Sequence, residues 1–234
     1  MDKRVWAVAM LGLAVCAAGH APCAAQGVTP PPEALLSQAA NGEGFQPLFK
    51  DDLSDAQMQR GGWEFANGEL ASQGRGDIWT KERYGDFVLD LEFKCDPDTN
   101  SGVFLRCDSI ADWLNTAIEV QILQPNDKYP NDKWHCGAIF DCLAPAKLAV
   151  KGPGEWNRLL IIAKGSMIYV QLNGEWVASM NLDEWTARGR NPDGTPNKFK
   201  NAYKDMKREG YIGLQYHGQP VWFRNMRVKP LAAS

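Results

Sequence analysis

Hydrophobic and polar residues alternate along many short segments of this chain, which is the pattern of β-strands with one face in a core. In segment 87–95 the odd positions are apolar or Cys and the even positions are mostly charged. Segment 211–217 places Ile212 and Leu214 on one face and a polar row that ends at His217 on the other. The pattern predicts strands at 63–65, 69–72, 77–80, 87–95, 102–107, 117–123, 138–140, 158–164, 167–172, 176–181, 211–215 and 221–228.

Turn signals separate these strands. The dipeptide Asn-Gly stands at 67–68 and at 173–174, and it favours the positive backbone φ that tight hairpins require. Many short strands with few helical stretches predict one all-β domain over residues 45–231, built as a sandwich of two antiparallel sheets.

Segment 182–209 interrupts the strand pattern. It carries a run of basic residues, and Phe199, Tyr203 and Met206 recur at helical spacing. A loop of this length in a compact domain is usually functional or disordered. Two interpretations stand side by side: a short amphipathic helix that lies on the sandwich, or a lid beside a binding groove.

Residues 1–25 have the features of a secretory signal peptide. Lys3 and Arg4 precede an apolar run, and small residues follow up to a cleavage site after Ala25. Residues 26–44 are rich in proline and predict a tether that holds one short helix. We therefore expect an exported protein, either periplasmic or secreted.

Other locations and partners are less favoured by the sequence. A lipoprotein acylated at Cys16 or Cys23 is disfavoured, because the residues before these cysteines are Val15 and Pro22 rather than small residues. No second apolar run is long enough to span a membrane. The net charge of −3 gives no support for nucleic-acid binding.

Four cysteines remain after the signal peptide, in a compartment that permits disulfides. Three pairings are open. We favour local pairs, Cys95 with Cys107 and Cys136 with Cys142, because each pair flanks a short loop that a hairpin could close. The spacing does not suit a structural zinc site.

One group of polar side chains is predicted to share the outward face of a sheet. Glu119 and Gln121 alternate with the apolar residues of segment 117–123, and Arg106 and Lys81 lie on the same face if their strands are neighbours. Gln215 and His217 extend this face. Each residue alone suits a solvated sheet surface. Together they predict a concave face lined with hydrogen-bonding groups.

Tryptophans accompany these polar residues. The chain has nine of them, and rings such as Trp79, Trp113, Trp134 or Trp222 could stack on a sugar. Arg, Gln, Glu and His side chains bond sugar hydroxyls. The combination favours a carbohydrate ligand.

Several short motifs follow one another in a definite order along the chain. They are GFQPLF at 44–49, WEFANGEL at 63–70, WTKERYGDF at 79–87, NSGVFLR at 100–106, IEVQIL at 118–123, GPGEWN at 152–157, LNGE at 172–175, YIGLQYHG at 211–218 and VWFRN at 221–225. Their order resembles one family, the 3-keto-disaccharide hydrolase domain. The resemblance implies a concanavalin-like jelly-roll sandwich that acts on glycosides whose sugar is oxidised at C3.

A 3-keto sugar needs only one base and an electrophile, because its carbonyl acidifies the C2 hydrogen and permits elimination of the C1 substituent. A double-displacement glucanase is disfavoured, since the strand around Glu119 carries a single carboxylate. We assign Glu119 or His217 as base or acid, and Arg106 or Lys81 as the stabiliser of the enolate. Expected substrate contacts are Gln121, Asn100, Gln215, Trp79 and Trp113, with Asp141 and Lys151 as secondary candidates.

Alternatives remain at this stage. No cofactor is certain; a divalent cation could replace the cationic side chain, with Glu119, Gln121 and His217 as ligands. A lectin-like carbohydrate-binding module would use the same face without turnover, and a structural domain would need none of these residues. As an enzyme, the protein would depend on a sugar 3-oxidoreductase to make the keto group.

Overall fold

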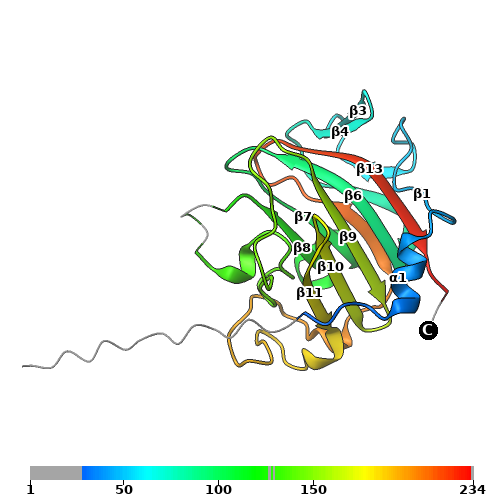
Figure 1. Cartoon of the computed structure of the whole chain (residues 1–234). Coiled ribbons are helices and arrows are strands. Elements are labelled where there is room, and N and C mark those ends of the chain that lie inside the picture. The colour runs from blue at the N-terminus through cyan, green and yellow to red at the C-terminus, as the bar shows by residue number, and fades with distance from the viewer. Residues whose placement is uncertain (1–27, 126–127, 129, 233–234) are drawn as a thin grey trace, which may run out of the picture.

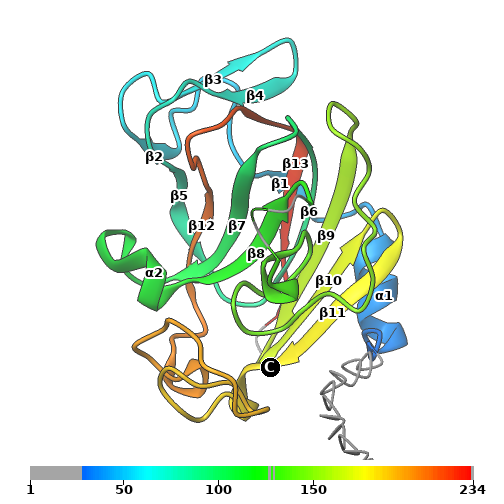
Figure 2. The same cartoon turned by 90° about the vertical axis from the view of Figure 1, so that its left-hand side faces the viewer.

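The computed structural model describes residues 28–125, 128 and 130–232, and the predicted signal peptide lies outside them. Within these residues two antiparallel sheets face each other (Figures 1 and 2). In spatial order the larger sheet has β11 (Glu175–Asn181), β10 (Met167–Leu172), β9 (Asn157–Lys164), β6 (Phe87–Cys95), β13 (Val221–Pro230), β4 (Glu69–Ser72) and β3 (Trp63–Ala66), with β1 (Gln46–Pro47) beside β13. The smaller sheet has β2 (Ala56–Met58), β5 (Ile78–Tyr84), β12 (Gly210–Leu214), β7 (Asn100–Cys107) and β8 (Ile118–Leu123).

The main core fills the space between the sheets. Ile118, Val120 and Ile122 of β8 belong to it, as the alternation predicted. The predicted all-β sandwich is confirmed. The expected strand at 138–140 is reduced to single bridges at Ile139.

Helical structure is sparse in the described residues. The elements are α1 (Glu33–Ala40), α2 (Trp113–Thr116) and the 3₁₀ turns η1 (Ile110–Asp112), η2 (Asp132–Trp134), η3 (Leu182–Glu184) and η4 (Tyr203–Asp205). None of these helices is long and apolar enough to cross a membrane. In α1, Leu35 and Ala39 pack on the outer face of the larger sheet against Val88 and Leu160 (Figure 1). This part of the predicted tether is therefore packed on the domain.

Segment 182–209 forms no α-helix, so the expected amphipathic helix is wrong; the segment has η3 and η4 at its two ends. Figure 2 shows it at the end of the sandwich near α2. Phe199 and Tyr203 are buried in the core. Asn115 holds the segment from α2, since its Oδ1 accepts from the Lys200 N–H and its carbonyl accepts from the Asn201 amide. We call segment 182–209 the wall, because hydrogen bonds hold it at this end of the sandwich.

The prediction that Arg106 lies on the outward polar face is wrong. A β-bulge opposes Leu105 and Arg106 to a single residue of β12, and Arg106 takes a positive φ of 50°. The bulge breaks the alternation and turns the side chain away. Its fully buried guanidinium donates to the carbonyls of Gly85 and Gly165 and pairs with Asp86 at 2.9 Å.

The predicted local disulfides are also corrected, because the four cysteines in the described residues are free and buried. Cys95 ends β6 in the larger sheet and Cys107 ends β7 in the smaller sheet, so the chain crosses between sheets there instead of forming a hairpin. Burial raises the pKa of Cys136 and of Cys142 to about 12. A raised thiol pKa disfavours the thiolate, which is the reactive form of cysteine.

The buried Arg106–Asp86 pair predicts a large effect on stability. Arg106→Met keeps much of the side-chain volume but removes one ion-pair partner of Asp86, which is 9% exposed and also pairs with Lys164. We expect the free energy of unfolding in urea to fall by about 3–5 kcal/mol. Lys164→Met is the matched control and should cost less, because Lys164 is 26% exposed. Unchanged stability of Arg106→Met would contradict the structural role.

Candidate active site

The outer face of the smaller sheet carries a row of residues fixed by strand register. Trp79 of β5 pairs with Gly213 of β12, Gly213 pairs with Phe104 of β7, and Phe104 pairs with Glu119 of β8. Side chains in one such row point to the same face. The aromatic rings of this row are therefore followed by the carboxyl group of Glu119.

Two glycines let large side chains lie flat on this face. A Cβ at Gly213 would stand 2.5 Å from the Trp79 ring, and a Cβ at Gly102 would stand 2.5 Å from Oε1 of Glu119. Trp79 stacks on Phe104 with ring centroids 4.9 Å apart, and Phe104 contacts the ring of Trp113 at 4.6 Å. The carboxyl of Glu119 thus lies over β7, one strand in from its own backbone.

A second, polar row runs beside the first. The Gln215 N–H bonds the Gly102 carbonyl, and Gly102 pairs with Gln121. The Gln121 amide donates to Oδ1 of Asn100 at 2.8 Å, which leaves Oε1 of Gln121 without a hydrogen bond in the described structure. Oε1 of Gln215 is also buried and unpaired within the described residues. Two unpaired acceptors on one face suit the hydroxyl donors of a ligand.

Glu119 is almost fully buried, with 5% of its surface exposed. Burial and, to a smaller extent, the carboxylate of Asp77 raise its pKa to about 8, although the Lys198 charge and the Gln215 amide act in the opposite direction. At neutral pH most of this carboxyl is protonated. A carboxyl that titrates near neutral pH is suited to act as both acid and base.

The structure adds two charged residues that the sequence analysis did not single out. Asp77 immediately precedes β5 and alternates with the core residue Ile78, so strand alternation could have identified it. Lys198 lies in the 182–209 wall, with Nζ 4.5 Å from the centroid of the Phe140 ring. Irregular backbone carries no periodic signal that would have pointed to Lys198.

His217 follows β12 and is exposed. Burial raises the pKa of Asp77, and the His217 charge acts in the opposite direction. The sequence paired His217 with Glu119; in the structure Asp77, which lies on the row of Gln215, is linked to both, because the His217 charge acts on Asp77 and the Asp77 charge acts on Glu119. Asp77 therefore belongs to the same group of interacting charged residues as His217 and Glu119.

Three other predicted residues are held by contacts of their own. Lys81 is exposed and donates to the Ser54 carbonyl at 2.7 Å, beside the edge strand β2. Lys151 donates to the Trp156 carbonyl within its own loop. Asp141 accepts from the Trp134 indole and from the Lys198 N–H, so it positions the wall. A contact of these three with substrate stays a prediction.

The proposed cation site gains no support from acidic, His or Cys side chains. Within the described part of the chain, no group of three or more such residues is placed to hold a metal ion. Glu119 and Gln121 share the buried face, whereas His217 is exposed beyond the end of β12.

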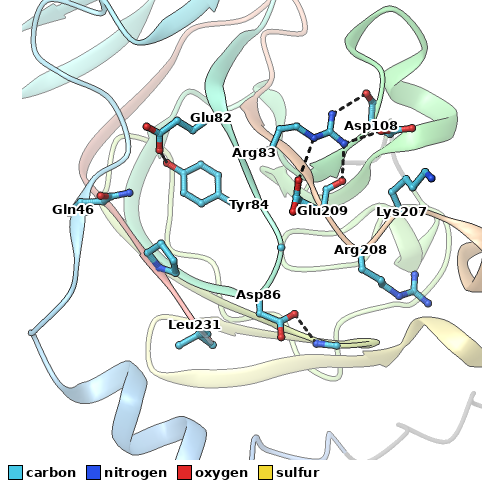
Figure 3. Close-up of a pocket in the computed structure, with 13 residues that line it drawn as sticks. Gln46, Glu82, Arg83, Tyr84, Asp86, Asp108, Lys207, Arg208, Glu209 and Leu231 are labelled. Atoms are coloured by element: carbon cyan, nitrogen blue, oxygen red, sulfur yellow. Dashed lines mark hydrogen bonds and ion pairs between the residues drawn. The ribbon is translucent and has the colours of Figure 1, made fainter. Parts of the chain in front are cut away.

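A cavity of about 890 Å³ opens elsewhere, around the turn between β5 and β6 (Figure 3). Several of its charged groups neutralise one another, since Arg83 pairs with Asp108 at 2.7 Å and with Glu209 at 3.6 Å. Glu119, Gln121 and Gln215 do not line this cavity. We place the candidate site on the outer face of the smaller sheet.

Comparison with solved structures supports the fold. A Parabacteroides distasonis protein provisionally described as a glycosyl hydrolase is 36% identical, with a TM-score of 0.77 over 80% of this chain and 99% of that chain. A Bacillus subtilis protein with a galectin-like fold is 14% identical, with a TM-score of 0.51 over 81% of this chain and 96% of its own. The predicted concanavalin-like jelly roll is confirmed.

Sequence comparison identifies the family. A Bacteroides thetaiotaomicron protein named 3-keto-disaccharide hydrolase is 30% identical over 190 residues, which cover 70% of this chain and 65% of the relative. This chain therefore matches less than two thirds of that relative's length. The family described as the 3-keto-alpha-glucoside-1,2-lyase-like domain matches residues 44–229. The chain belongs to this family.

Proposed function

We propose that this protein is an exported enzyme that cleaves glycosides oxidised at C3 of the sugar. Family membership and the name of the Bacteroides thetaiotaomicron relative support a carbohydrate-active enzyme of this class. The observation that carries the mechanism is the buried carboxyl of Glu119 on a face with unpaired acceptors.

The substrate chemistry matches a site with a single buried acid–base group. A ketone at C3 acidifies the C2 hydrogen, so a base takes that proton and the electron pair moves into an enolate. The enolate then expels the C1 oxygen, which leaves with a proton as the free aglycone. Addition of water across the new C1–C2 double bond restores the 3-keto sugar.

Glu119 is the proposed base. The absence of water around its carboxyl raises its proton affinity, and a stronger base abstracts the C2 proton more readily. The same carboxyl, once protonated, can return its proton to the product. His217, exposed beside the face, is the proposed donor to the leaving oxygen.

Lys198 takes the role of enolate stabiliser that the sequence analysis gave to Arg106 or Lys81. Its charge acts on Glu119, and its ammonium lies against the rings of Phe140 and Trp134 at 4.5 and 5.3 Å from their centroids. The Lys198 side chain is exposed, and a cation beside a buried carboxyl stabilises negative charge that develops on the neighbouring substrate oxygen.

Hydroxyl recognition falls to the polar row. Oε1 of Gln121 and Oε1 of Gln215 are proposed to accept hydrogen bonds from sugar hydroxyls, with Asn100 holding the Gln121 amide in place. Trp113 is half-buried, whereas Trp79 is 4% exposed, so Trp113 offers the more accessible ring for stacking.

The biological setting is proposed from the sequence. Residues 1–25 would direct export to the periplasm or beyond. A substrate oxidised at C3 requires a sugar 3-oxidoreductase to act before this enzyme.

The first test uses a 3-keto glucoside and its unoxidised parent. The purified protein should release aglycone from the keto form only, because the parent lacks an acidic C2 hydrogen. Glu119→Gln keeps the shape of the side chain but removes the base, so kcat should fall by roughly 10²-fold or more. Aglycone release, followed by chromatography, measures both.

Folding of Glu119→Gln is checked by circular dichroism. Equal turnover of the keto glycoside and its parent would overturn the elimination mechanism. Binding of the keto glycoside without release would favour a carbohydrate-binding module.

Lys198→Met tests the cation, because methionine can keep the ring contacts without the charge. We expect kcat/KM to fall by roughly 10²-fold if Lys198 stabilises the enolate. Lys200→Met removes an exposed charge two residues away and should leave the rate near that of the unmodified protein. Equal losses of kcat/KM in the two variants would mean that the rate depends on the total positive charge of segment 182–209 and not on Lys198 in particular.

Glu119 also predicts a pH-dependent stability. Its pKa is about 8 in the folded protein and 4.5 when exposed, so the folded state binds the extra proton between these values. Stability of the unmodified protein should fall relative to Glu119→Gln by up to about 1.4 kcal/mol per pH unit as the pH rises through that window. Urea unfolding at several pH values measures this difference. A constant difference would contradict the raised pKa.

A further inference from the structure

A second carboxyl group lies on the same face as Glu119. Asp77 stands one residue before Ile78, and Ile78 pairs with Leu214 and points into the core. Asp77 therefore points outward, level with Gln215 at the end of β12. Its Oδ1 accepts from the Tyr216 N–H at 2.9 Å, which fixes the carboxylate.

Because Gly102 has no side chain, β7 places nothing between the two carboxyl groups at this position of the outward face. Glu119 bends over β7 because Gly102 has no side chain, and this moves its carboxyl one strand closer to Asp77. On the outward face, the position between them is Gln215, which is 4% exposed. Little water separates the two charges, so their repulsion is poorly screened.

Other charged and titratable groups also face these carboxyls. Lys198 of the wall favours the ionised form of Glu119, and the hydroxyl of Tyr203 in η4 is close enough for the Glu119 charge to raise its pKa. His217 favours the ionised form of Asp77, while burial raises the Asp77 pKa. Glu119 is thus subject to opposing effects of one cation and one carboxylate.

We propose that Asp77 is a positioning residue for the proton of Glu119. Its negative charge, fixed by the Tyr216 N–H on the face over which Glu119 bends, disfavours ionisation of Glu119 and strengthens it as a base once it ionises. This inference rests on the proposed function only for its catalytic consequence; the electrostatic coupling itself is independent of substrate.

The main measurement is the titration of the Glu119 carboxyl by NMR, with isotope-labelled glutamate and assignment by Glu119→Gln. Asp77→Asn keeps an acceptor for the Tyr216 N–H and removes the charge. The Glu119 midpoint should move to a lower pH than in the unmodified protein and stay above 4.5, because burial is unchanged. Asp77→Glu keeps the charge and should restore the higher midpoint.

Asp51→Asn is the matched control, since Asp51 is an exposed aspartate of the turn before β2. In this variant the titration midpoint of Glu119 should equal that of the unmodified protein. If Asp77→Asn fails to fold, Asp77→Ser serves as a second uncharged variant with an oxygen acceptor. An unchanged Glu119 midpoint in the folded uncharged variant overturns the proposal.

The rate of aglycone release gives an independent test. The acidic limb of the kcat/KM profile with a 3-keto glucoside should shift in Asp77→Asn by the same interval as the NMR midpoint. A structural role alone would lower the rate at every pH without this shift, and that result would overturn the catalytic part. If the midpoint shifts but no variant releases aglycone, the coupling stands and the proposed function fails.

Discussion

The structure depends on keeping the carboxyl of Glu119 out of water on a sheet face that would ordinarily be wet. Gly102 makes this possible, because any side chain there would occupy the space of Oε1. The carboxyl then lies against the sheet, beside the buried amides of Gln121 and Gln215, where its ionised form is poorly solvated. A raised proton affinity follows from this placement.

The same fold can support different carbohydrate chemistry, since chemistry depends on the groups placed on the concave face rather than on the sandwich. Double displacement needs two carboxyl groups with separate and stable roles. Here the two carboxyl groups interact electrostatically; Glu119 lies on β8 and Asp77 immediately precedes β5, and β12 and β7 lie between these two strands. Repulsion between them strengthens one base, which is what proton abstraction from an activated carbon requires.

Alternation identified the strands and the outward face that holds Glu119, Gln121 and Gln215, because a period of two is fixed by backbone geometry. It failed at Arg106, where a bulge with positive φ reverses the side chain. The disulfide prediction failed because nearness in sequence does not show whether a loop closes a hairpin or crosses to the other sheet. Lys198 could not be predicted, since tertiary hydrogen bonds place it.

Those hydrogen bonds connect the wall to the site. Oδ2 of Asp141 accepts from the Lys198 N–H, and the Asp141 carbonyl accepts from the buried amide of Asn191. Asp141 itself adopts a positive φ of 59°, a strained conformation for a non-glycine residue that its surroundings must maintain. The backbone that carries Lys198 is therefore positioned by polar contacts of Asp141. Since the sheet supplies the carboxyl and the wall supplies the cation, sequence changes in the wall can alter the electrostatics of the site while the fold of the sheet is unchanged.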